Sequence, residues 1–182
     1  PLAGMEDCKT AGPETDGNVE KAVDRLRQKG LAVAAKRAGK ETREGVIEAY
    51  IHGGGKIGVM VEVACETDFV AKTDDFKAFA RNIAMHVAAV NPLALSRDEV
   101  SAEVLQREKD IYINQALESG KPQQIAEKMV AGKMEKFLAE VCLLEQKYVK
   151  NPDLSVQDLL NELVAKMGEN ISIKKFARFQ IG

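Results

Sequence analysis

An alternating segment at residues 57–65 is the feature that most restricts the fold. It predicts a β-strand, because apolar residues return at every second position and therefore share one face. The strand pattern stops at Glu66. The residues of the apolar face are Ile57, Val59, Val61, Val63 and Cys65, and they alternate with Gly58, Met60, Glu62 and Ala64.

The segment Thr67-Asp68-Phe69-Val70 follows this strand directly, and a helical pattern follows soon after. Threonine and aspartate suit a helix N-terminus, because their side-chain oxygens accept hydrogen bonds from free backbone N–H groups. Residues 67–70, called the corner below, therefore join two rigid elements. A rigid corner spends little binding energy on ordering, so Asp68 and Phe69 form a candidate binding site in which we expect Phe69 to be exposed.

A β-hairpin ends at the corner. Residues 46–51 predict its first strand, the glycine-rich segment 52–56 its turn, and residues 57–65 its second strand. The run Gly53-Gly54-Gly55-Lys56 is not a phosphate-binding loop. Such a loop requires Ser or Thr after the lysine and then a helix, whereas Ile57 begins a strand.

The helix after the corner begins at a capping site, Thr73-Asp74-Asp75, and ends at Asn91-Pro92. We expect its apolar stripe to pack on the hairpin. His86 lies at the edge of the stripe, where a packed or half-exposed histidine is commoner than a ligand. The stripe consists of Phe76, Phe79, Ala80, Ile83 and Val87.

Two long helical patterns follow at residues 97–118 and 121–142, joined by Ser119-Gly120-Lys121-Pro122. So short a connection predicts antiparallel neighbours. Their apolar seam is thin, which is typical of a projecting two-helix coiled coil. Such a hairpin is either a dimer contact or an arm that grips a partner.

The C-terminal part predicts a helix and a strand. Ser155 should cap a helix that ends at Gly168. Residues 171–181 then alternate as a third strand that joins the hairpin. Phe176 falls on its polar face, where it is either an exposed partner contact or covered by a neighbouring segment. We expect the apolar face of this strand to carry Ile171, Ile173, Ala177, Phe179 and Ile181.

Residues 1–39 predict an N-terminal helical module with a linker, and residues 40–182 a core α+β domain that includes the hairpin of 97–142. Helix-breaking residues up to position 18 predict a loop with at most one helical turn at 5–9. An amphipathic helix from Val19 should end at Gly30, which leaves 31–39 as helix or linker. The basic face of this helix is expected to be solvated.

Composition argues against several classes of function. Lys and Arg number 26 against 28 Asp and Glu, a net charge of −2, without the basic excess of a nucleic-acid binder. The three cysteines lack C-x-x-C spacing and predict reduced thiols, and no apolar run is long enough to span a membrane. No catalytic or metal-ligand motif is present. The sequence therefore predicts a non-enzymatic protein that binds another protein; an enzyme, a coiled-coil adaptor and an RNA binder using basic residues 36–43 remain alternatives.

The segment Cys65-Glu66-Thr67-Asp68-Phe69-Val70-Ala71 resembles the signature of the elongation factor Ts family. The resemblance spans almost the whole chain, in order and at similar spacing. The other matching segments are Tyr50-Ile51-His52, Gly58-Val59-Met60-Val61-Glu62, Ile83-Ala84-Met85-His86-Val87-Ala88, Gly120-Lys121-Pro122, Ile125-Ala126-Glu127-Lys128-Met129-Val130, Gly168-Glu169-Asn170-Ile171 and Arg178-Phe179.

The resemblance implies an α+β fold, in which helices pack on a three-stranded antiparallel sheet, with a protruding antiparallel coiled-coil hairpin and a small ubiquitin-associated-like N-terminal module. Two features lead us to expect that this module is incomplete. The chain starts almost at the turn Leu2-Ala3-Gly4-Met5, and Gly12-Pro13 interrupts the next helix.

The resemblance also implies a function: guanine nucleotide exchange on translation elongation factor Tu. Thr67, Asp68, Phe69 and Val70 would enter beside the partner's magnesium and nucleotide site, and His86, Phe176 and Arg178 would be secondary contacts. The family pattern implies no catalytic residue, metal or cofactor, and no direct contact with nucleic acid or membrane. A homodimer giving a two-plus-two complex is a further expectation. The expected location is the cytoplasm, or an organelle interior if the start of the chain is a processing site.

Overall fold

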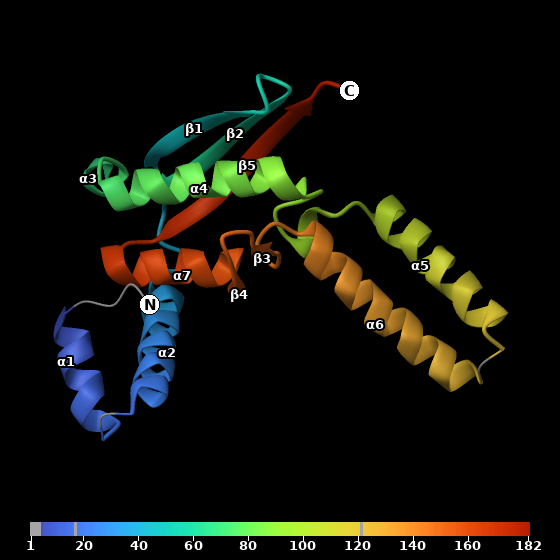
Figure 1. The fold of residues 1–182 in the computed structure, drawn as a ribbon, viewed down its shortest axis with the longest axis horizontal. Coiled ribbons are helices and arrows are strands. Elements are labelled where there is room, and N and C mark those ends of the chain that lie inside the picture. Colours follow the sequence, from blue (N-terminus) through green and yellow to red (C-terminus); the bar gives the residue numbers. More distant parts are fainter. Residues whose placement is uncertain (1–4, 17, 121) are drawn as a thin grey trace.

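The computed structural model of the protein describes residues 5–16, 18–120 and 122–182 (Figure 1). The sheet and the helices that cover it form one part, and a long pair of helices projects from it. The helices are α1 (Met5–Glu14), α2 (Val19–Arg37), α3 (Asp68–Ala71), α4 (Asp74–Val90), the 3-10 helix η1 (Arg97–Glu99), α5 (Ala102–Glu118), α6 (Gln123–Val141) and α7 (Val156–Met167). The strands are β1 (Glu44–His52), β2 (Ile57–Cys65), β3 (Lys147–Tyr148), β4 (Asn151–Ser155) and β5 (Ile171–Gln180).

The main sheet has three antiparallel strands, as predicted, and their order is β1-β2-β5. β2 is the central strand, and its inward residues Val61, Val63 and Cys65 are completely buried. Helix α4 covers this face (Figure 1). The predicted stripe of α4 is buried against the sheet, which confirms the pairing of helix and hairpin: Phe76, Phe79, Ala80, Ile83 and Val87.

Strand β5 departs from the predicted alternation because it contains a β-bulge. Glu62 of β2 pairs with Lys175, while the next residue, Val63, pairs with Ile173, so Lys174 is an extra residue in β5. One extra residue exchanges the two faces of a strand from that point on. The placement of Ala177, Phe179 and Ile181 on the inner face was therefore wrong, and all three are exposed.

The same bulge turns Phe176 inward. Its side chain is half-buried and packs on the main core, so of the two alternatives for this residue the covered one is observed. Arg178, two residues further on, is also half-buried, and its Nη2 and Nε donate to the carbonyl oxygen of Ala88 at 3.1 and 3.3 Å. These contacts attach the second half of β5 to the C-terminal end of α4.

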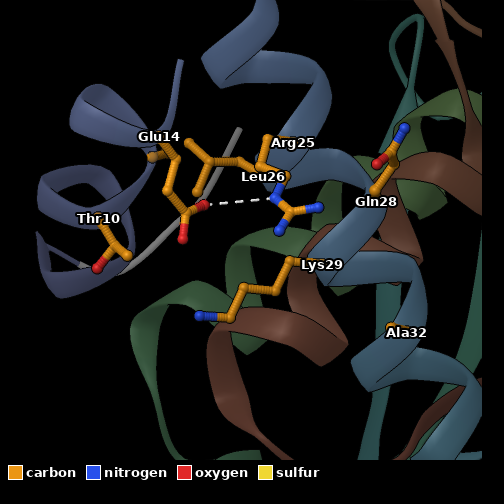
Figure 2. Close-up of a pocket in the computed structure, with 8 residues that line it drawn as sticks. Thr10, Glu14, Arg25, Leu26, Gln28, Lys29 and Ala32 are labelled. Carbon is orange, nitrogen blue, oxygen red and sulfur yellow. Dashed lines mark hydrogen bonds and ion pairs between the residues drawn. The ribbon is translucent and has the colours of Figure 1, made fainter. Parts of the chain in front are cut away.

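Helix α1 packs on α2, and the two enclose an open groove (Figure 2). Ala11 is buried in this contact. Arg25 of α2 reaches across to Glu14 of α1, with Nε 3.4 Å from Oε2. Because both groups are largely exposed, this ion pair adds little to stability, and the apolar contact holds the pair together.

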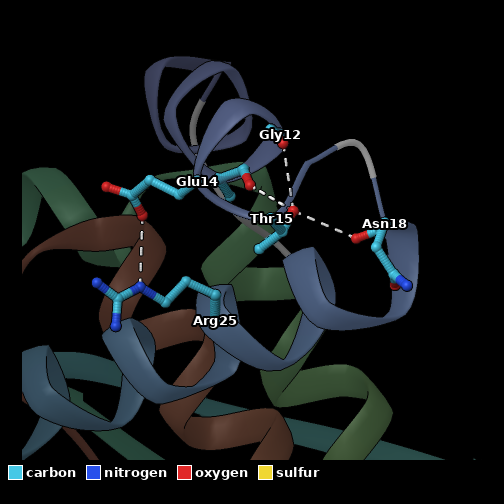
Figure 3. A network of polar contacts seen from close by, with 6 residues as sticks. Gly12, Glu14, Thr15, Asn18 and Arg25 are labelled. Carbon is cyan, nitrogen blue, oxygen red and sulfur yellow. Dashed lines mark hydrogen bonds and ion pairs between the residues drawn. The ribbon is translucent and has the colours of Figure 1, made fainter.

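The expected loop at residues 5–18 was wrong, because α1 continues through Gly12 and Pro13. Pro13 lies one residue before the end of the helix, so the distortion that its ring causes falls where α1 ends. The Thr15 hydroxyl donates to the carbonyl oxygens at this end of the helix: it lies 2.7 Å from that of Ala11 and 3.3 Å from that of Gly12 (Figure 3). The predicted turn Leu2-Ala3-Gly4-Met5 is not tested, because residues 2–4 lie outside the described part of the chain.

Helix α2 runs without interruption to Arg37, so the predicted end at Gly30 was also wrong, and residues 31–37 are helical. The glycine has a packing role instead. A Cβ at Gly30 would lie 3.4 Å from the Cβ of Ala165, so its absence lets α2 approach α7 closely. The N-terminal helices are thereby packed against the core (Figure 1).

Helices α5 and α6 form the predicted helical hairpin, which projects away from the sheet (Figure 1). α5 begins at Ala102 because Ser101 caps it, its Oγ accepting from Val104 N at 3.3 Å. Lys121 of the connection lies outside the described residues. At the base, Arg97 forms ion pairs with Glu135 and Glu145 at 2.9 and 2.6 Å. No helix in the described ranges is long and apolar enough to cross a membrane.

Gly45 should be essential for the start of the sheet. It has φ +152°, and a Cβ there would lie 2.2 Å from the Val63 carbonyl oxygen and 2.8 Å from the Ala64 Cα. Gly45→Ala should therefore lower the free energy of unfolding by about 2 to 4 kcal/mol, measured by urea denaturation. Gly132→Ala is the matched control, since the space around Gly132 in α6 is open and alanine favours a helix. Equal stabilities of the two variants would contradict this packing.

A candidate protein-binding site at the strand–helix corner

Two threonine caps build the corner. Thr67 caps the single-turn helix α3, with its Oγ1 accepting from Val70 N at 3.5 Å, and Thr73 caps α4, accepting from Phe76 N at 3.3 Å. The Thr73 hydroxyl also donates to the Val70 carbonyl oxygen at 2.8 Å. The two turns are therefore connected, and both predicted capping sites are confirmed.

Neighbouring side chains at the corner have opposite environments. Phe69 is 79% exposed, which confirms the prediction that it points to solvent, whereas Val70 is 9% exposed and packs in the main core. Ala71 is buried as well. Val70 thus anchors the turn and presents no free side chain to a partner, while Phe69 is held at the surface without apolar cover.

Asp68 presents a carboxylate beside Phe69. Lys72, one turn later, donates a hydrogen bond from Nζ to Asp68 Oδ2 at 2.6 Å. This hydrogen bond keeps the pKa of Asp68 below its ordinary value and raises the pKa of Lys72. Both side chains are solvent-exposed, so the pair contributes little to folding. Asp68 is therefore an ionised acid whose present partner can be exchanged for a group on another molecule.

Glu169, from the turn between α7 and β5, contacts the corner, and the sequence reasoning missed it. Its carboxylate accepts from Thr67 N at 3.0 Å and from Thr67 Oγ1 at 2.7 Å. The segment 168–171 matched the family pattern, which was a signal that these residues matter. No local pattern, however, indicates a contact between residues so far apart in sequence.

His86 lies away from the corner, in the second half of α4, and is completely buried. Its Nε2 lies 3.0 Å from Gln146 Oε1, and its Nδ1 accepts from Val149 N at 3.3 Å. The interpretation as a packed histidine is confirmed. His86 therefore has no exposed surface in the free protein, and its place among the secondary contacts stays a prediction.

The predicted site residues therefore divide into two groups. Thr67, Asp68, Phe69 and Val70 are brought together at the corner, as neighbours in sequence must be. His86 lies in the second half of α4, Arg178 donates to Ala88 at the C-terminal end of that helix, and Phe176 packs on the main core from β5. The structure does not bring this second group to the corner.

Comparison with known proteins decides the family. The family model "Elongation factor TS" matches residues 5–182. The chain belongs to the elongation factor Ts family. The resemblance seen in the sequence is thereby confirmed, and the matched range includes the whole corner.

Elongation factors Ts of several bacteria are similar over nearly the full chain. The protein of Desulfotalea psychrophila is 72% identical over 180 residues, covering 99% of this chain and 91% of the relative. That of Desulfosudis oleivorans is 62% identical with the same coverage, and that of Carboxydothermus hydrogenoformans is 60% identical, covering 99% of this chain and 83% of the relative. Membership of the elongation factor Ts family implies guanine nucleotide exchange in protein biosynthesis, with elongation factor Tu as the partner.

Two further observations bear on metal binding and on thiol chemistry. No group of three or more His, Cys, Asp or Glu side chains in the described ranges is placed to hold a metal ion. Burial raises the pKa of the Cys65 thiol to about 11, which keeps it protonated and unreactive at neutral pH. The corner is accordingly the best-supported site.

Phe69 and Val70 should differ sharply in their effect on stability. Phe69→Ala removes an exposed ring and should change the free energy of unfolding by no more than about 0.5 kcal/mol. Val70→Ala removes two buried carbon atoms and should cost about 1.5 kcal/mol. Chemical denaturation of both variants measures the difference, and a destabilised Phe69→Ala protein would show that the ring is part of the core.

Burial also predicts how stability depends on pH. Desolvation lowers the pKa of His86, and the hydrogen bond with Gln146 opposes this only in part. The folded state therefore favours the neutral ring. The contribution of the neutral ring to the free energy of unfolding is fully present above the pKa of histidine in the unfolded chain, about 6.5. This contribution is lost as the pH falls below that value, because the unfolded chain takes up the proton first.

Urea denaturation between about pH 7.5 and about pH 5.5 should show this loss in the unaltered protein. His86→Gln should remove most of the dependence in this range. His52→Gln is the control, because His52 is exposed at the hairpin turn. If His86→Gln and the unaltered protein lose stability equally, burial of the neutral ring is not the cause.

Proposed function

We propose that this chain speeds the release of GDP from elongation factor Tu by inserting Asp68 and Phe69 beside the magnesium and nucleotide site of its partner. The exposure of Phe69 on an anchored turn is the observation that carries the proposal. The Phe69 side chain is large, apolar and 79% exposed, next to buried Val70. Its exposure to water is unfavourable in the free protein, and its transfer into an apolar gap of a partner is favourable.

The physical effect rests on the geometry of Mg²⁺. This ion demands near-octahedral coordination with ligand distances of about 2.0 to 2.1 Å. A displacement of the segments that carry its ligands by about 1 Å therefore weakens the binding of the ion severely. Phe69 would cause the displacement by occupying space, and the ionised carboxylate of Asp68 would repel phosphate oxygens nearby. GDP then loses the metal that joins it to the protein.

Release of the factor follows from the same coupling. If this chain lowers the affinity of elongation factor Tu for GDP by some ratio, bound GDP lowers the affinity of elongation factor Tu for this chain by the same ratio. Incoming nucleotide therefore displaces the factor. The proposal needs no catalytic residue, metal or cofactor in this chain, and in this sense the protein is not an enzyme.

The projecting hairpin would hold other parts of the partner. We infer that α5 and α6 form a short coiled coil, and that exposed apolar side chains on it, Ile113, Leu117 and Ile125, are available for contact. Helices α1 and α2 would form the ubiquitin-associated-like module. Arg178 and Phe176 stay predictions as secondary contacts, since both side chains keep part of their surface exposed.

A second copy of the chain would cover the outer face of the sheet. Because of the bulge in β5, this face is unusually apolar, with Phe179 68% and Ile181 75% exposed beside Ile47, Ile51 and Met60. Contiguous apolar surface of this kind marks interaction sites. Around a two-fold axis the face would meet itself, which gives two factors and two elongation factor Tu molecules in the complex. The proposed location is the cytoplasm, where translation elongation takes place.

The exchange proposal is tested by the release of fluorescent GDP from elongation factor Tu in a stopped-flow instrument. The unaltered protein should accelerate release at least tenfold, and Phe69→Ala should lose most of the acceleration while the fold stays intact. An exposed apolar residue elsewhere, Val149→Ala, is the control and should keep the full effect. Binding through α5 and α6 without any acceleration would overturn the proposal in favour of an adaptor function.

The dimer is tested by light scattering on a size-exclusion column. The unaltered protein should have twice the 19.9 kDa mass of the chain. Phe179→Asp should shift it to the monomer, because a buried unpaired charge disfavours the interface. A monomer at every concentration of the unaltered protein would contradict the proposed face.

A further inference from the structure

We infer that the turn Gly168-Glu169-Asn170 holds the corner in its binding geometry, and that Glu169 is a positioning residue for nucleotide exchange. The inference rests on the proposed function, because it assigns a role at the same site. The turn begins at Gly168, the C-cap of α7, which adopts φ 71°, and it leads directly into β5.

Glu169 uses both carboxylate oxygens on one residue. Oε2 accepts from Thr67 N at 3.0 Å, and Oε1 accepts from Thr67 Oγ1 at 2.7 Å. Hydrogen bonds to an ionised acceptor are stronger than neutral ones, and a two-point contact fixes direction as well as distance. Thr67 is the residue that caps α3, so Glu169 fixes the cap itself.

A second pair of contacts runs in the opposite direction. Glu66, just before the corner, accepts from Asn170 N at 2.6 Å. Each of the two segments therefore supplies a carboxylate to a backbone N–H of the other. This reciprocal arrangement joins the end of β2 to the start of β5 beyond the last pair of the sheet, Cys65 and Ile171.

The same turn also holds the end of the N-terminal helices. Asn170 donates from Nδ2 to the Lys40 carbonyl oxygen at 2.6 Å, and Arg37 at the end of α2 lies 3.7 Å from Glu66. Three parts of the chain meet here: the exit of α2, the corner, and the α7–β5 turn. The turn thus sets the N-terminal helices and Phe69 in a defined relation.

The corner needs this support because α3 is only one turn long. A helix of four residues cannot stabilise itself, and Phe69 makes too little contact with the protein to hold the turn. Without Glu169, the direction of Phe69 would depend on the buried side chains of Val70 and Ala71 and on the two threonine caps. Part of the binding energy would then be spent on ordering the corner, and fewer encounters would be productive.

The test compares Glu169→Ala with Glu169→Gln. Alanine removes both contacts and should lower the apparent second-order rate constant of GDP release about tenfold. Glutamine can restore both, since its oxygen can accept from Thr67 N and its NH₂ group can donate to Thr67 Oγ1, so it should stay within about threefold of the unaltered protein. Glu162→Ala, which removes a carboxylate from α7 outside the turn, is the control and should have no effect.

A double-mutant cycle separates positioning from general destabilisation. Thr67→Val removes the hydroxyl contact, so combining it with Glu169→Ala should cost clearly less than the product of the two single effects. Amide hydrogen exchange of the free protein is the second measurement. Glu169→Ala should raise exchange at residues 67–71 while the middle of α4 stays protected.

Amide hydrogen exchange tests the positioning role of Glu169 separately from the proposed release of GDP. If the unaltered protein fails to release GDP but Glu169→Ala still exposes residues 67–71, the proposed function is wrong and the positioning role stands. Unchanged protection at residues 67–71 in Glu169→Ala would overturn the positioning role, whatever the rate of GDP release. Equal rates for Glu169→Ala and the unaltered, active protein would overturn it as well.

Discussion

Burial of the inner face of β2 is the constraint on which the rest of the structure depends. Val61 and Val63 are completely buried beneath α4, and hydrogen bonds to β1 and β5 occupy both edges of the strand. A central strand with two paired edges and a covered face has little freedom to shift its register. Its end at Cys65 is therefore fixed, and the corner that follows starts from a fixed point.

The corner holds two neighbouring side chains in opposite environments. Val70 continues the core, whereas Phe69, one residue earlier, is placed in solvent beside the ionised Asp68. Both ends of the short turn are supported: Thr73 leads into α4, and Glu169 reaches Thr67 from the α7–β5 turn. An acid and an aromatic ring held in this way can enter a partner's site without a large ordering cost, which suits a factor that must bind and leave repeatedly.

Local patterns predicted the parts of this arrangement that depend on neighbours in sequence. The alternation of 57–65 predicted a strand, the threonines predicted both caps, and the place of Phe69 between a strand end and a helix start predicted its exposure. The burial of Val70 was not predicted. The remainder depends on contacts between distant residues. Lys174 forms a bulge because β5 must match β2, α2 continues through Gly30 where it packs on α7, and Glu169 reaches Thr67 only in the folded chain. No period or capping motif encodes such contacts, and for this reason the apolar outer face of the sheet was not foreseen.

The central claim is that the corner is already ordered before a partner binds. Backbone ¹⁵N relaxation on the free protein tests it most directly, since it reports the motion of each N–H on the ps–ns timescale. An ordered corner should give order parameters of about 0.85 for residues 67–72, equal to those in the middle of α4. Values below about 0.6 at Asp68 and Phe69, with α4 still rigid, would contradict it, because the site would then be ordered only on binding.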